Sequence, residues 1–247
     1  MTVDIILAAS RYDRGARKLE KAARKYVSLS HLVLHTEVER QKRKAALRKA
    51  TPFGWNCLTG QYGNGDDCAV QYDRERLRIR HYERPVLTRK KVKPSGAPIH
   101  GVVMVFEDRT AGKSFVVGLA HFPSSVEKYA GRRMRSKARR ALAWMQCFRK
   151  LKKRVNKLKK KYDCDGALIT GDFNMNEKLR AVRATRKVIA PRYKSAWHRL
   201  PFFGTFGKRL IEWVLYKGKI HVDAKLLADD DSSDHRPMIA KLTWRNR

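Results

Sequence analysis

The sequence contains few acidic residues, few cysteines and no long hydrophobic stretch. Only 23 of its 247 residues are Asp or Glu, against 57 Lys or Arg, so the formal net charge is +34. A charge this far from zero exceeds what solubility requires and indicates a polyanionic partner, nucleic acid first and an anionic membrane surface second. Because 43% of the residues are hydrophobic, the chain is expected to fold rather than to form a disordered basic tail.

The cysteines favour neither a disulfide framework nor a zinc site. Cys57, Cys68, Cys147 and Cys164 form no Cys-x-x-Cys pair and lack the histidine spacing of a zinc site. Reduced, mostly buried thiols are expected, as is typical of the cytoplasm. The apolar run 3–9 is interrupted by a charge and is too short for a signal peptide or a membrane span. We therefore expect no transmembrane segment, no secretion signal, and a protein of the cytoplasm or one associated with the nucleoid or nucleus.

The chain carries no sign of a division into domains. It has no internal repeat and no linker rich in Pro, Gly or Ser that is long enough to separate domains. A chain of this length suits one large α/β domain or two small ones, and it should bury roughly three quarters of its unfolded surface. We expect a single domain over residues 1–247.

Apolar runs alternate with turn residues in a way that predicts an α/β fold. Residues 3–9 indicate a first strand and residues 32–38 a second. Between them, Leu19 and Tyr26 fall on one face of a helix that Asp13 can cap. Further strands are expected at 68–72, 77–82, 101–106, 114–120, 167–169 and 210–215 and at the C-terminus, with a hairpin turn at 60–66, an exposed basic loop at 85–98 and a basic helix or loop at 178–187.

The segment 128–162 is unusual because every charged residue between Lys128 and Lys161 is basic. Apolar residues recur there at steps of three and four, which predicts one amphipathic helix at about 128–162 whose apolar face packs on a sheet. Like charges four residues apart cost roughly 0.2–0.5 kcal/mol per pair, which favours an anionic ligand over a merely solvated face. The apolar positions are Ala138, Ala141, Leu142, Met145, Phe148, Leu151, Val155, Leu158 and Tyr162.

Residues 168–176, with the sequence Leu-Ile-Thr-Gly-Asp-Phe-Asn-Met-Asn, are an apolar run that ends at a glycine. The run indicates a buried strand, and Gly171 allows a tight turn where the strand ends. Asp172 and Asn174 then lie on the same side of an extended backbone, which is a way to aim an acid and an amide at one phosphate. Taken alone, the segment could equally be an Asp/Asn turn after a core strand.

A second motif stands near the C-terminus, where residues 232–237, Ser-Ser-Asp-His-Arg-Pro, precede a final alternating strand. Gly-Asp-Phe-Asn followed later in the chain by Ser-Asp-His-Arg-Pro resembles the endonuclease/exonuclease/phosphatase superfamily, and the order of the two motifs makes the match specific. The resemblance implies a four-layered α/β sandwich, in which two mostly antiparallel β-sheets pack face to face with helices outside.

The resemblance also implies a set of catalytic residues. Asp172 would orient or deprotonate the attacking water, and Asn174 would hold a phosphate oxygen. His235 would bind or protonate the scissile phosphate, with Glu212 setting its tautomer. His121, at the end of the strand before the Gly-Asp-Phe-Asn strand, would assist the leaving group.

A metal ion completes the implied site. Glu37 stands where the superfamily binds its catalytic magnesium, and Asp234, which is also counted among the catalytic residues, would support the metal shell. Hard oxygen ligands of this kind favour Mg²⁺ or Mn²⁺. Two-metal nucleases need a denser acidic cluster than this chain contains, so a single ion is expected.

Two positions depart from the superfamily pattern. The strand that carries Glu212-Trp213 has an Asp in the superfamily, and that Asp orients the final histidine. After the first strand the superfamily has an Asn that contacts the phosphate or the metal shell, and here Ser10-Arg11 stands in its place. Arg11 could bind phosphate instead.

Together these features favour a magnesium-dependent phosphodiesterase, a nuclease that acts on DNA, with RNA as the second choice of substrate. Three alternatives stay open: a phosphoinositide or sphingomyelin phosphodiesterase that uses the basic surface for membranes, a catalytically weakened protein that coats nucleic acid, and a ribosome- or RNA-associated factor. The residues expected to contact phosphates are Arg11, Arg132, Arg139, Arg149, Lys153 and Lys157.

Overall fold

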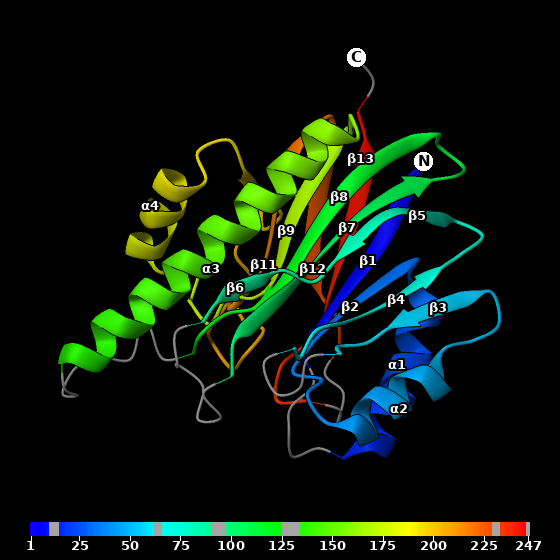
Figure 1. Ribbon diagram of the computed structural model, residues 1–247, viewed down its shortest axis with the longest axis horizontal. Coiled ribbons are helices and arrows are strands. Elements are labelled where there is room, and N and C mark those ends of the chain that lie inside the picture. Colours follow the sequence, from blue (N-terminus) through cyan, green and yellow to red (C-terminus); the bar gives the residue numbers. More distant parts are fainter. Residues whose placement is uncertain (10–14, 62–65, 90–96, 125–133, 229–232, 246–247) are drawn as a thin grey trace.

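The computed structural model describes residues 1–9, 15–61, 66–89, 97–124, 134–228 and 233–245, with the backbone alone at 134–138. Two β-sheets pack face to face between two outer layers of helices (Figure 1). This arrangement confirms the four-layered α/β sandwich that the two motifs predicted.

The first sheet contains β1 (Thr2–Ala9), β2 (Leu32–Thr36), β3 (Trp55–Leu58), β4 (Ala69–Asp73), β12 (Ile220–Leu226) and β13 (Met238–Trp244). Its strand order is β12-β13-β1-β2-β4-β3, and only β1 and β2 run parallel. The predicted hairpin is present, because β3 and β4 are consecutive and antiparallel.

The second sheet contains β5 (Leu77–Glu83), β6 (Val86–Thr88), β7 (Ile99–Asp108), β8 (Lys113–His121), β9 (Gly166–Asp172), β10 (Lys194–Ser195) and β11 (Glu212–Gly218). Its order is β10-β11-β9-β8-β7-β5, with β6 paired to β7. The pair of β8 and β9 is parallel and the other pairs are antiparallel.

In the described part of the chain, four helices cover the outer faces of the two sheets. They are α1 (Ala16–Leu29), α2 (Gln41–Ala50), α3 (Met134–Lys161) and α4 (Arg180–Ile189). The helices α1 and α2 lie on the first sheet, whereas α3 runs across the second sheet with α4 beside it (Figure 1). None of the described helices is long and apolar enough to cross a membrane.

Side chains of the central strands of the second sheet alternate between two cores. In β8, Val117 and Leu119 belong to the core between the sheets, whereas Val116 and Ala120 pack under α3. This alternation follows from the two-residue period of a strand. Both faces of β8 are therefore buried up to its last residue, His121.

The helix α2 was not predicted, because its buried face mixes apolar with basic residues. Arg43 and Lys44 are both buried on that face. Lys44 donates from Nζ to the carbonyl oxygen of Gly60 at 2.6 Å, and Arg43 donates from Nη1 to the carbonyl oxygen of Glu37 at 3.1 Å. Basic residues on the buried face interrupt the apolar pattern and leave only Ala46, Leu47 and Ala50 to mark it, so periodicity gives a weak signal for this helix.

The prediction of an exposed basic loop at 85–98 is wrong at its beginning. Residues 86–88 form β6, in which Leu87 and Thr88 are fully buried. The strand pairs with β7, and Thr88 donates from its hydroxyl to Gln146 of α3 at 3.0 Å. Residues 90–96 lie outside the described part of the chain.

The predicted amphipathic helix is present as α3, and the part of the prediction at 128–133 lies outside the described residues. Its apolar face packs on the second sheet as expected, through Ala143, Trp144, Cys147, Phe148, Leu151, Val155 and Leu158. The assignment of Leu142 to this face is wrong, because its side chain is 56% exposed. Leu142 lies nine residues before Leu151, which is about two and a half helical turns. The two leucines therefore lie on opposite sides of the helix.

Leu151 and Leu142 give a matched pair for measuring how strongly α3 is anchored. Leu151→Ala is expected to lower the free energy of unfolding by about 2–5 kcal/mol, because it leaves a cavity above β8. Leu142→Ala is expected to change the free energy of unfolding by less than about 0.5 kcal/mol. Urea denaturation of both variants measures the difference, and equal losses would contradict the packing of α3 described above.

Candidate active site

The ends of five segments from both sheets converge at one edge of the sandwich. In the second sheet, His121 pairs with Asp172 in the β8–β9 register, and Asp172 pairs with Glu212 in the β9–β11 register. From the first sheet come Glu37, which follows β2, and His235, which precedes β13. Residues that are far apart in sequence therefore meet because strand register fixes where each strand ends.

Gly171 lets β9 pass close to β8. Its φ angle is 137°, a value that L-residues rarely adopt. A β-carbon at this position would overlap the carbonyl oxygen of Ala120. Only glycine fits here, and it brings the carboxylate of Asp172 directly beside His121.

Asp172 is buried and held by the backbone and side chain of Asn174. The backbone N–H of Asn174 donates to Oδ1 of Asp172 at 2.7 Å, and Nδ2 of Asn174 donates to Oδ2 at 3.3 Å and to the carbonyl oxygen of Phe122 at 3.0 Å. The amide of Asn174 thus positions the acid in this arrangement. Its contact with a phosphate oxygen stays a prediction.

The environment of Asp172 makes it a good proton acceptor near neutral pH. Burial raises the pKa of Asp172 to about 7, assisted by the charge of Glu212 and opposed by His121 and His235. A carboxylate with a pKa near the working pH suits general base catalysis.

Glu37 adopts a strained backbone conformation. Its φ angle is 63°, which costs a non-glycine residue about 1–2 kcal/mol. The conformation is held from both sides, because Arg43 donates to the carbonyl oxygen of Glu37 at 3.1 Å and the N–H of Val38 donates to the carbonyl oxygen of Asp67 at 2.8 Å. Such strain is typical of functional sites, and here it aims the Glu37 carboxylate at Asp172 and His235.

Glu37, Asp172 and His235 form a group that fits a metal ion. Each offers one ligand atom, and these three atoms lie within 4.8 Å of one another. The two carboxylates supply the hard oxygen atoms that Mg²⁺ and Mn²⁺ prefer. Among the described residues Asp234 is not part of this group, and its Oδ1 lies 3.8 Å from Nε2 of His235. Its place in the metal shell stays a prediction.

His235 is held by Glu212. Nδ1 of His235 contacts Oε1 of Glu212, and the Glu212 residue is 1% exposed. The centre of the Phe206 ring lies 4.9 Å from the centre of the imidazole. Burial lowers the pKa of His235, but the negative charges of Glu212, Asp172 and Glu37 outweigh it and raise the pKa to about 10. The superfamily has an aspartate at the position of Glu212. The longer glutamate contacts the histidine as that aspartate is expected to do.

Asp67 is a site residue that the sequence did not reveal. Oδ2 of Asp67 lies 2.6 Å from Nδ1 of His121, and Nε2 of His121 lies 3.6 Å from Asp172 and 3.7 Å from Glu37. Burial lowers the pKa of His121, but Asp67 first and then Asp172 and Glu37 raise it to about 9. Asp67 follows a glycine-rich segment that indicated only a turn, so no signal in the sequence pointed to this contact.

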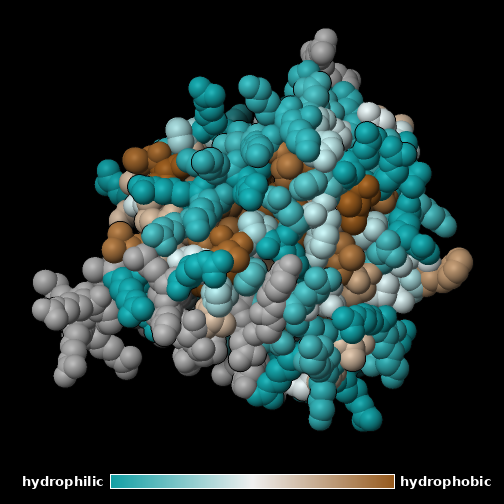
Figure 2. Space-filling view, in the orientation of Figure 1, coloured by the Kyte–Doolittle hydropathy of each residue, from teal (hydrophilic) through white to brown (hydrophobic). Residues whose placement is uncertain are grey.

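Four of the predicted phosphate-binding residues are described, and these four lie on α3 rather than at the strand ends. Arg139, Arg149, Lys153 and Lys157 are described, and all four are exposed. Arg11 and Arg132 lie outside the described residues. Hydrophilic side chains dominate the face of the molecule over α3 (Figure 2).

Solved structures share this fold over nearly the whole chain. An endonuclease/exonuclease/phosphatase from Bacteroides vulgatus is 16% identical, with a TM-score of 0.76 and coverage of 99% of this chain and 100% of its own. The human Nocturnin catalytic domain with a bound sulfate anion is 13% identical, with a TM-score of 0.69 and coverage of 98% and 94%. TDP2 of D. rerio in complex with a single-strand DNA product is 13% identical, with a TM-score of 0.66 and coverage of 98% and 99%.

The likeness confirms the predicted fold of the endonuclease/exonuclease/phosphatase superfamily. No protein family matches the sequence itself, and no curated protein matches it. At identities of this size the comparison concerns the fold, and the chemistry of the site rests on the residues described above.

Proposed function

Starting from the endonuclease/exonuclease/phosphatase fold of this chain, we propose that it is a magnesium-dependent phosphodiesterase, a nuclease that acts on DNA in preference to RNA. The observation that carries the proposal is the meeting of Glu37, Asp172 and His235 within 4.8 Å. Each comes from a different part of the chain and would have little reason to stand beside the others without a shared ligand. The protein would act as one domain over residues 1–247, in the cytoplasm or on the nucleoid or nucleus.

Glu37 would hold the metal, with Asp234 supporting its shell, while Asp172 beside them acts on the attacking water. A bound Mg²⁺, or Mn²⁺ in its place, neutralises the charge that develops on a phosphodiester during hydrolysis. His235 fits a different role, because a protonated imidazole has no lone pair on Nε2 to give to a metal. It is suited to donating a hydrogen bond to the scissile phosphate.

The remaining steps are divided among residues of this chain. Asp172 orients a water molecule and takes its proton, since its pKa is raised to about 7. His121, held by Asp67, is protonated at neutral pH and assists the leaving oxygen. Glu212 holds the ring of His235 in place and favours its protonated form, and Asn174 keeps Asp172 in position.

Relatives in fold support a phosphate ester as substrate. TDP2 of D. rerio was solved with a single-strand DNA product, Nocturnin with sulfate, and a further neighbour, from Bacteroides thetaiotaomicron, is a mannosyl-6-phosphatase. The formal charge of +34 favours the polyanion among these substrate classes. DNA is therefore proposed over a small phosphate ester, and over a phospholipid headgroup.

Incubation of the pure protein with supercoiled plasmid tests this proposal. We expect nicking with Mg²⁺ and none with EDTA, because the carboxylates alone do not neutralise the reacting phosphate. Agarose gels measure the fraction nicked over time. Nicking that is unchanged by EDTA would contradict the metal assignment, and tight DNA binding with no cleavage at any Mg²⁺ concentration would favour a non-enzymatic DNA-coating protein. Hydrolysis of lipid headgroups in liposomes, without plasmid nicking, would favour a phospholipid phosphodiesterase.

A further inference from the structure

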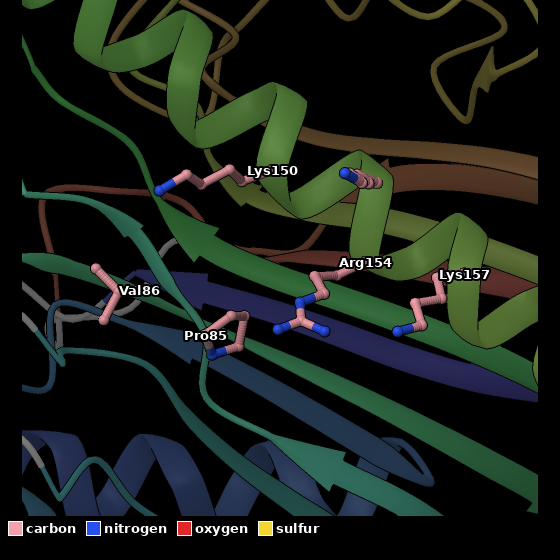
Figure 3. A pocket seen from close by; sticks show the side chains of 6 residues that line it. Pro85, Val86, Lys150, Arg154 and Lys157 are labelled. Atoms are coloured by element: carbon pink, nitrogen blue, oxygen red, sulfur yellow. The ribbon is translucent and has the colours of Figure 1, made fainter.

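A basic groove of about 530 Å³ lies beside α3, away from the converging strand ends. We name it the α3 groove. Figure 3 shows Arg154 and Lys157 extending from α3 beside Pro85, in the link between β5 and β6. Its lining residues are Pro85, Val86, Lys150, Lys153, Arg154 and Lys157.

Most of the basic side chains that line the α3 groove have no acidic partner among the described residues. The sequence of α3 contains no acidic residue. Arg154 lies 3.7 Å from Glu83, but Lys150, Lys153 and Lys157 form no ion pair with any residue in the described ranges. Because these positions are three and four residues apart, their charges repel one another across the helix surface. An anion in the groove would remove this repulsion.

A second basic pocket, at the C-terminal end of α3, differs in this respect. Its Lys159 donates to the carbonyl oxygen of Cys164, and its Lys217 lies 4.9 Å above the ring of Tyr193. Asp163 also lines that pocket. These lysines already serve the packing of the protein, whereas the three groove lysines make no such contact among the described residues.

The chemistry of the lining fits a phosphodiester backbone. Lysine and arginine side chains offer hydrogen-bond donors and no acceptors, which suits phosphate oxygens and does not distinguish base edges. Pro85 lacks an N–H and Val86 is apolar, so the opposite wall suits sugars. Lys150 and Lys157 are separated by roughly 10 Å along the helix, which corresponds to about three nucleotide steps of a stacked strand.

The position of the groove on α3 sets how far it lies from the catalytic residues. Trp144 donates from its indole N–H to the carbonyl oxygen of Phe173 at 2.8 Å, and Phe173 directly follows Asp172. Lys150 and Lys157 lie roughly 9 Å and 20 Å further along the helix than Trp144. A strand that occupies both places must extend about six nucleotides beyond the reacting phosphate.

We propose that the α3 groove is an exosite for the phosphate backbone of a polynucleotide. The inference rests on the proposed nuclease function and adds a preference for length: oligonucleotides that reach the groove bind more tightly than short ones with the same reacting phosphate. Because the contacts are to phosphates, the preference is independent of base sequence.

The test compares two triple variants that lose the same charge. One changes the groove, as Lys150→Gln, Lys153→Gln and Lys157→Gln, and the control changes exposed residues of α1, as Arg17→Gln, Lys21→Gln and Lys25→Gln. Fluorescence anisotropy in metal-free buffer measures the binding of labelled oligonucleotides of about 30 and about 2 nucleotides, of which the shorter cannot span the groove lysines. We expect the groove variant to bind the long oligonucleotide at least about tenfold more weakly, with a slope of log affinity against log salt that is lower by about two units. The short oligonucleotide and the control should change less than about twofold, since charges beyond about 8 Å are screened at physiological salt.

Equal losses for both lengths, or for both variants, would overturn the exosite. So would a groove variant that loses binding to phosphatidylserine vesicles while keeping its affinity for the long oligonucleotide. The proposed nuclease function fails separately: length-dependent binding by a protein that never nicks plasmid would retain the groove and reject the enzyme. Plasmid nicking without any length dependence of binding would retain the enzyme and reject the groove.

Discussion

Glu37→Gln should lower the rate of magnesium-dependent plasmid nicking by about a thousandfold or more, because it removes the charge of a carboxylate that the proposed metal site needs. The side chain keeps its length and shape and is partly exposed, so the free energy of unfolding should change little. Initial rates at saturating Mg²⁺ measure the effect, and isothermal titration with Mg²⁺ measures metal binding without reference to activity. We expect comparable losses of rate for Asp172→Ala and His235→Ala.

Two controls separate this loss from a general effect on the protein. Glu75→Gln removes a carboxylate from the exposed turn between β4 and β5 and should leave the rate unchanged. Glycine adopts a φ of 63° without the steric cost that Glu37 bears there. The Glu37→Gly protein should therefore be at least as stable as the wild type, although it loses its activity. A Glu37→Gln protein that keeps more than about a tenth of the wild-type rate would reject Glu37 as a metal ligand.

The second large effect is expected at Glu212. Glu212→Asp should lower kcat by about a hundredfold, because the β9–β11 register fixes the backbone opposite Asp172 and a shorter side chain withdraws from His235. Glu212→Gln keeps the length but loses the charge that favours protonated His235, and it should also be slower. The loss should fall on kcat more than on KM, since Glu212 acts through His235 rather than on the substrate.

The result for Glu212→Asp decides between two views of the departure from the superfamily pattern. If the glutamate were a poor substitute for the superfamily aspartate, Glu212→Asp would be faster than the wild type. The contact between Glu212 and His235 argues for a slower variant. Glu107→Gln is a suitable control, because Glu107 pairs with Arg78 and Arg80 on the surface of the second sheet, where an ion pair contributes little to stability.

Most strands could be predicted because their apolar residues alternate or cluster with a period that is visible in the sequence. Residues 101–106 and 114–120 became β7 and β8 with small shifts of their ends. The predictions that failed lacked such a signal. The helix α2 buries basic residues, and β6 owes its burial to pairing with β7 and to the cover of α3 rather than to its own composition.

The sequence by itself determined the fold and the identity of most candidate site residues, because strand periodicity and the Gly-Asp-Phe-Asn and Ser-Asp-His-Arg-Pro motifs are local properties of the chain. It also determined the basic character of α3. Only the tertiary structure decided which side chains touch. The contact of Asp67 with His121, the reach of Glu212 to His235 and the separation of the α3 groove from the strand ends depend on strand register and on the rotation of a helix about its axis. Those quantities are set by packing between segments that are distant in sequence, and no local pattern encodes them.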